Sequence, residues 1–88
     1  MVEIVDVEVR EGGKKWKALK KLLEIVSEDP EREFSWSDLA RIIVSTGVSY
    51  PYSNNIILEL IYLGVLSKVG DRYAVDVEKL KEIVESVE

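Results

Sequence analysis

The side chains with the clearest chemical use occur in a stretch from 49 to 63, which reads SYPYSNNIILELIYL. Asparagine can form two hydrogen bonds with adenine in the major groove of DNA, and tyrosine can donate one to phosphate. Asn54 and Asn55 are therefore candidate base contacts, and Tyr50 is a candidate phosphate contact. This pattern favours recognition of double-stranded DNA by a helix.

Two cations close to this stretch could contact the DNA backbone. Lys68 and Arg72 flank Gly70-Asp71, a residue pair suited to a two-residue hairpin turn. A hairpin that carries a cation on each side of its turn can reach phosphates beside a helix lying in a groove. Lys68 and Arg72 are therefore predicted backbone contacts.

Four further cations gather on one side of a predicted helix from 14 to 27: Lys14, Lys17, Lys20 and Lys21. Of these, Lys17 and Lys21 are candidate phosphate contacts. The alternative is a solvated helix face on which Lys20 and Lys21 pair with Glu24, as neighbours on a helix do.

The composition argues against catalysis. The chain has no histidine and no cysteine, so it lacks the usual pairing of a nucleophile with a base and the usual zinc ligands. Gly12-Gly13 stands alone and makes no glycine-rich phosphate loop. We expect no enzyme activity, no metal and no cofactor, and no small-molecule ligand is evident.

The helix before the candidate contacts has a clear start and stop. Ser35 can cap it, and Asp38 can reach back to the cap nitrogen, while Phe34 and Leu39 are placed for a hydrophobic staple. Gly47 ends the helix, because glycine readily adopts the left-handed conformation found there.

The next helix and the hairpin are bounded in the same way. Ser49 can cap a helix that accepts Pro51 in its first turn and stops at Gly64. A hairpin then follows from 65 to 75. A short strand at Glu33-Phe34 is predicted to add a third strand to it.

Two terminal elements complete the predicted fold. Val5, Val7 and Val9 alternate with polar residues and predict a strand over 2–10. Asp76 can cap a last helix over 77–87, which carries an apolar stripe. Either element could pair with a second copy of the chain, so we expect a homodimer, although the stripe could equally pack within one chain.

The run Leu60, Leu63, Gly64, Val65, Leu66, followed by a hairpin, resembles the recognition helix and wing of small archaeal, bacterial or archaeal viral winged-helix regulators. The resemblance implies a single winged helix-turn-helix domain over 1–88, mainly α with a small antiparallel β wing. Its core would span 14–75. It also implies a DNA-binding transcriptional regulator that reads DNA with helix 49–63 and the wing 65–75.

The charge distribution opposes that function and supports another. The net charge is −5, and residues 42–67 hold no lysine or arginine and a single acid, Glu59. Asn54, Leu58 and Tyr62 lie on the predicted outer face of helix 49–63, where a partly apolar stripe suits a protein surface. The alternative is therefore a winged-helix module that binds another protein within a larger assembly.

Composition also suggests a setting. No signal peptide, lipidation motif or membrane-spanning run is apparent, so we expect a cytoplasmic protein with no membrane partner. Many charged residues and few thermolabile ones suggest a hyperthermophilic source, an archaeon or an archaeal virus.

Overall fold

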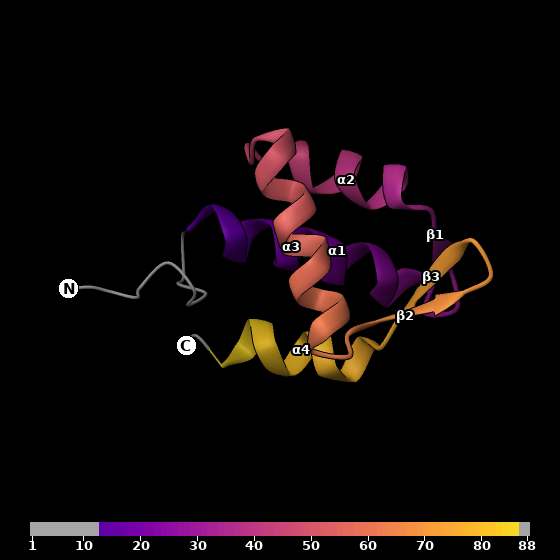
Figure 1. The fold of residues 1–88 in the computed structure, drawn as a ribbon. Coiled ribbons are helices and arrows are strands. Elements are labelled where there is room, and N and C mark those ends of the chain that lie inside the picture. Colours follow the sequence, from indigo (N-terminus) through magenta and orange to yellow (C-terminus); the bar gives the residue numbers. More distant parts are fainter. Residues whose placement is uncertain (1–12, 87–88) are drawn as a thin grey trace.

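The computed structural model describes residues 13–86, which form four helices and a three-stranded antiparallel sheet (Figure 1). The helices are α1 (Lys14–Glu28), α2 (Trp36–Val44), α3 (Tyr50–Tyr62) and α4 (Val77–Glu85). The strands are β1 (Glu33–Phe34), β2 (Leu66–Val69) and β3 (Arg72–Val75). The predicted class, mainly helical with a small antiparallel sheet, is confirmed.

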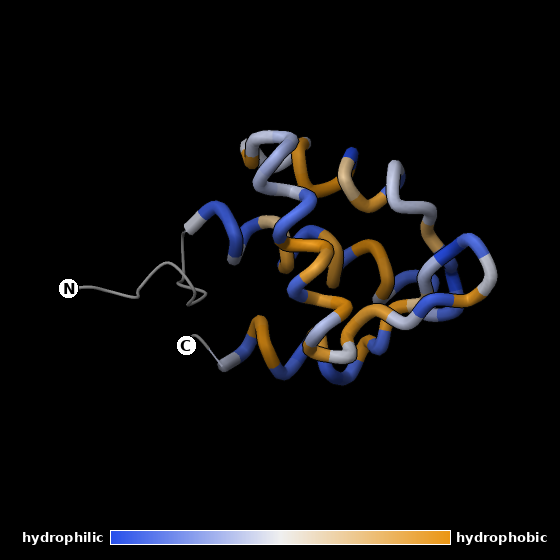
Figure 2. The backbone as a smooth tube through the Cα atoms, in the orientation of Figure 1, coloured by the Kyte–Doolittle hydropathy of each residue, from blue (hydrophilic) through white to orange (hydrophobic). Residues whose placement is uncertain are grey.

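One apolar core holds these elements together. α1 packs against both α2 and α4, and α2 packs against α3. Phe34, Leu19 and Ile57 are among the largest fully buried side chains, and they come from β1, α1 and α3. Figure 2 shows apolar segments of all four helices separated by hydrophilic ones, as expected of helices that bury one face each.

The sheet has the strand order β1-β3-β2, so the short β1 extends the β2–β3 hairpin as predicted. Val69 pairs with Arg72, which leaves Gly70 and Asp71 as a two-residue turn. Gly70 has a φ of 64°, and no residue other than glycine in the described part has a positive φ. Positive φ at only the first turn residue is the pattern of a type II′ turn.

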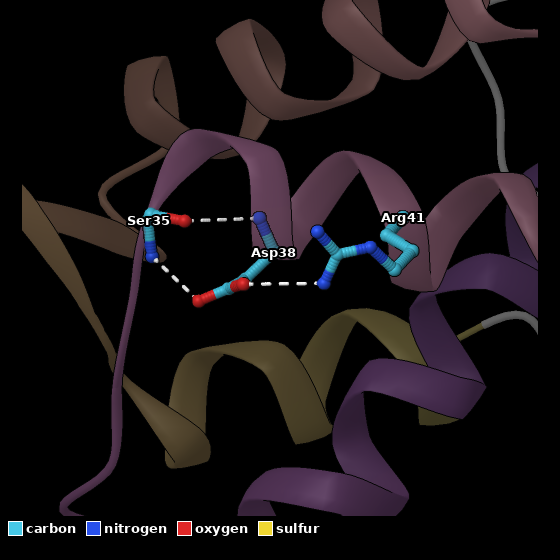
Figure 3. Close-up of polar contacts among 3 residues, drawn as sticks. All are labelled: Ser35, Asp38 and Arg41. Atoms are coloured by element: carbon cyan, nitrogen blue, oxygen red, sulfur yellow. Dashed lines mark hydrogen bonds and ion pairs between the residues drawn. The ribbon is translucent and has the colours of Figure 1, made fainter.

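The start of α2 follows the predicted capping box (Figure 3). The Asp38 backbone N–H donates to Ser35 Oγ at 3.1 Å, and the Ser35 N–H donates to Asp38 Oδ2 at 3.2 Å. The hydrogen bond from the Ser35 backbone, followed by the one from its side chain, lowers the pKa of Asp38 below 3.8, with smaller help from the charges of Arg41 and Arg72. Phe34 and Leu39 are both fully buried, as the staple requires.

The glycine stops are also confirmed. Gly47 and Gly64 adopt φ values of 103° and 84°, which side chains disfavour. Gly64 directly follows the C-cap of α3, and Gly47 lies two residues after the C-cap of α2. Ser49 Oγ accepts a hydrogen bond from the Tyr52 N–H at 3.3 Å, and Pro51 lies in the first turn of α3.

The apolar stripe of α4 is used largely within the chain. Leu80 and Val84 are buried, and the Trp16 indole N–H of α1 donates to the Val84 carbonyl at 3.3 Å. This favours internal packing over the predicted pairing of two copies through this helix. Val87 and the predicted strand over 2–10 lie outside the described residues.

Within residues 13–86, no helix has the length and apolar character needed to cross a membrane.

Candidate functional site

One face of α3 is turned toward solvent. Its buried side, facing the core, consists of Ser53, Ile56, Ile57 and Leu60. The opposite side carries Pro51, Asn55, Leu58 and Tyr62, all exposed, which we call the outer stripe. Successive residues of a helix are 100° apart, so these four fall within about 60° of one another around the axis. The predicted outer positions Asn55, Leu58 and Tyr62 are therefore brought together.

The outer stripe is apolar at its C-terminal end. Tyr62 is 88% exposed and Leu58 is 55% exposed, and both are large side chains. Leu63, which caps the helix, adds a further exposed side chain. Large hydrophobic residues that lie together on a surface mark contact sites more often than single ones do.

Asn54 is placed differently from its neighbour Asn55. It is half-buried, and its Oδ1 accepts a hydrogen bond from the Trp36 indole N–H at 2.8 Å. Trp36 in turn packs edge-on against Tyr73 of β3, with ring centroids 6.0 Å apart. Two hydrogen bonds to adenine would require this Oδ1. In this structure Asn54 joins α3 to α2 and the hairpin.

The only acid of α3 is also engaged. Glu59 Oε1 pairs with Lys15 Nζ of α1 at 2.5 Å, and the Lys15 side chain is only 10% exposed. The pair places the start of α1 beside the last turn of α3. The outer stripe and its flank therefore carry no net charge.

One exposed cation, Arg41, lies beside the N-terminal end of α3. Arg41 of α2 lines a depression of about 350 Å³ with Ser37, Val44 and Tyr50. Arg41 also contacts the Asp38 carboxylate at 3.4 Å (Figure 3). Sequence reasoning missed Arg41, and its position one turn after the capping Asp38 was the available signal.

The hairpin cations do not point the same way. Lys68 pairs across the strands with Tyr73, and Arg72 pairs with Val69. Adjacent cross-strand pairs project to opposite faces of a β-ribbon. Lys68 and Arg72 therefore project from opposite faces of the hairpin. For both to contact one DNA backbone, as predicted, their long side chains would have to bend around the hairpin.

Lys17 and Lys21 lie away from α3. They line a depression of about 340 Å³ with Trp16, Lys20, Glu24 and Thr46, a set that includes no residue of α3. Lys17 is about 200° around α1 from Lys15, which faces α3. Lys20 lies over the Trp16 ring, 4.8 Å from its centroid. The structure thus does not join these lysines to Tyr50 and Asn55.

Other site types receive no support in the described part of the chain. Residues 13–86 contain no group of three metal-ligating side chains close enough to hold a metal ion. The two depressions are open to solvent, and each lining combines at least one charged side chain with one aromatic side chain, Trp16 or Tyr50.

Comparisons with protein-family models, with curated proteins and with solved structures found no match. The arrangement of residues on α3 therefore carries the functional argument.

Proposed function

We propose that the chain is a winged-helix domain, with α3 in the place of the recognition helix and β2–β3 as the wing. The element order α1, β1, α2, α3, β2, β3 supports this assignment. The pairing of β1 with β3 supports it as well, since the strand before α2 then joins the hairpin.

We further propose that the domain binds protein rather than DNA through the outer face of α3. The observation that carries this proposal is the neutrality of that face. Its stripe has no charged residue, and Glu59 beside it is paired with Lys15. A helix that enters a DNA groove is surrounded by phosphates, and cations supply most of its affinity. An uncharged stripe ending in Leu58 and Tyr62 suits an apolar partner instead.

The spacing of the four residues in the outer stripe indicates which kind of partner surface would fit it. Pro51, Asn55, Leu58 and Tyr62 follow intervals of four, three and four residues, which is the spacing of a helix–helix seam. A leucine and a tyrosine at such positions can insert between side chains of a facing helix. The partner should therefore present a helix with its own uncharged, apolar stripe.

Duplex DNA is the second candidate, because Arg41 is exposed beside Tyr50, and Lys68 and Arg72 are exposed on the hairpin that follows α3. Tyr50 is 58% exposed, and Asn55 is exposed in the outer stripe. In this candidate function, a transcriptional regulator, Asn55 would contact a base and the three cations would contact phosphates.

Photo-crosslinking tests the protein-binding proposal. A benzophenone amino acid replaces Tyr62 in one sample and Val69, an exposed hairpin residue, in a matched control. Both are irradiated in extract from the source organism. We expect Tyr62 alone to capture a defined protein, which is then purified and titrated with the unlabelled chain. Leu58→Glu should abolish that binding, and Lys68→Ala with Arg72→Ala should leave it unchanged.

A labelled duplex provides the opposing test. Under the DNA hypothesis, affinity falls steeply between about 50 and 200 mM salt and drops when Lys68 and Arg72 become alanine. Under the protein hypothesis, the chain binds no duplex at the lower salt concentration. Tight, salt-dependent duplex binding that Asn55→Ala weakens by roughly 1–3 kcal/mol would overturn the proposal.

A further inference from the structure

We propose that the helix that packs on the outer stripe of α3 is α3 of a second copy of the chain, running antiparallel to it. This inference rests on the proposed function and names its partner. It places a two-fold interface on the outer stripe of α3, the helix that stands in front of α1 in Figure 1.

The stripe is complementary to itself. Its intervals of four, three and four residues read the same in both directions, so an antiparallel copy presents the same spacing. A two-fold axis between residues 56 and 57 sets Tyr62 against Pro51 of the second copy and Leu58 against its Asn55. The Tyr62 ring would pack on Pro51, and the Leu58 side chain would pack on the small amide of Asn55, so both contacts are compact. A two-fold interface of this kind repeats each contact twice.

The distribution of charge also favours contact between two copies at the outer stripe. Two copies with a net charge of −5 each repel one another, so contact costs least where ionised groups are absent. Residues 42–67 contain a single ionised side chain, Glu59, and Lys15 of the same copy neutralises it. The stripe therefore needs no opposite charge from its partner. An identical uncharged stripe meets this condition.

The exposed area has a suitable composition. Tyr62, Leu58 and Leu63 are 88%, 55% and 46% exposed in the single chain. Tyr50 and Tyr52, at 58% and 37%, lie at the other end of the same helix, on its two flanks and about 90–110° from the centre of the stripe. A contact made by one helix from each copy is smaller than a standard interface, so we expect a dissociation constant on the order of 10–100 µM.

Sedimentation equilibrium of the full chain tests the inference. Over roughly 10 to 500 µM protein, a range that brackets this constant, the average mass should rise from 10.0 kDa toward twice that value. Leu58→Glu should weaken association at least about tenfold, because it buries a charge on both sides of the two-fold axis. Val69→Glu, which makes the same change at an exposed hairpin residue, should leave it unchanged. Tyr62→Ala repeats the test at a side chain too exposed to affect folding.

The register has a separate test, since the chain contains no natural cysteine. Asn55→Cys and Leu58→Cys chains are mixed and oxidised. The antiparallel register predicts that the mixed disulfide forms faster than either self-disulfide, because positions 55 and 58 oppose each other across the axis. Faster self-disulfides at both positions would contradict the register.

Failure here is distinguishable from failure of the proposed function. A wild-type chain that stays monomeric over the whole concentration range overturns the homodimer. The protein-binding function then stands if Tyr62 still captures a partner that Leu58→Glu loses. A monomeric chain that captures nothing contradicts both.

Discussion

At the scale of single residues, Asn54 and Asn55 have different roles although they are adjacent and identical. The outward direction of Asn55 could be predicted from helical spacing. The hydrogen bond from Trp36 to Asn54 could not, because it depends on how α2 crosses α3 and not on the spacing within either helix. The same holds for the pairing of Lys15 with Glu59, which joins residues of two helices far apart in the sequence.

This difference predicts that two matched substitutions change the free energy of unfolding by different amounts. Asn54→Ala leaves the half-buried Trp36 N–H without its acceptor, and should lower the free energy of unfolding by about 1 kcal/mol. Asn55→Ala changes an exposed side chain and should stay within about 0.5 kcal/mol of wild type. Urea denaturation followed by tryptophan fluorescence measures both. Equal losses would show that the Trp36 contact does not contribute to stability.

Asp38 gives a prediction for acid conditions. Its pKa is lower in the folded chain than the ordinary value of 3.8, chiefly because the Ser35 backbone N–H donates to the carboxylate. A lowered folded pKa stabilises the fold at pH above the unfolded value, and this contribution is lost as the pH falls from 3.8 through the folded pKa. The free energy of unfolding should therefore depend less on pH below about 4 in Asp38→Asn than in wild type.

Urea titrations at a series of pH values between about 2 and 5 measure this dependence, since the range covers the ordinary carboxyl pKa. Asp71→Asn, which removes an exposed carboxylate from the hairpin turn, is the matched control for the loss of one carboxylate. If Asp38→Asn and wild type lose stability in parallel over this range, the capping box does not contribute in the way described.

At the scale of elements, the sequence was sufficient to predict the boundaries. The starts of α2, α3 and α4 each carry a capping side chain, and a glycine with positive φ follows the ends of α2 and α3. These signals are local, so they can be recognised from the amino-acid sequence alone. The packing of α4 against α1 was one of two open interpretations, because the apolar stripe of a helix does not identify what covers it.

The two glycine stops should be sensitive to any side chain. A methyl group added at Gly47 would meet no atom within 4 Å, so Gly47→Ala tests the backbone conformation alone. We expect it to lower the free energy of unfolding by about 1–2 kcal/mol. At Gly64 the added carbon would lie 2.9 Å from Lys79 Nζ, the end of a flexible side chain that can move away. Gly64→Ala should therefore cost a similar amount.

Thermal or urea unfolding of both variants gives the comparison. Combining Gly64→Ala with Lys79→Ala separates the crowding of the lysine from the backbone strain. Recovery of most of the lost stability in the double variant would mean that the lysine, rather than the positive φ, requires glycine at this position.

At the scale of the whole molecule, the distribution of charge favours the proposed protein-binding function over DNA binding. In the described part of the chain, Lys15 pairs with Glu59 of α3, and the other cations occur on the outer side of α1, just before β1, on α2, on the hairpin and on α4, so the outer stripe of α3 is neutral. The sequence predicted the neutral stretch over 42–67. It also led to one DNA site that combined Lys17 and Lys21 with the residues of α3, which the arrangement of α1 does not support. Which faces of a helix bundle meet depends on packing over the whole core.

Amide spectra of the ¹⁵N-labelled chain test the central claim, that the outer stripe of α3 is a protein-binding face used between copies. Spectra are compared between a dilute sample, a concentrated sample, and a dilute sample with duplex DNA at low salt. We predict that raising the protein concentration shifts the amide signals of Asn55, Leu58 and Tyr62 and leaves those of Lys68 and Arg72 unchanged. We also predict that duplex DNA shifts none of these five signals. Shifts at Asn55, Lys68 and Arg72 on addition of DNA, with no effect of concentration, would contradict the claim.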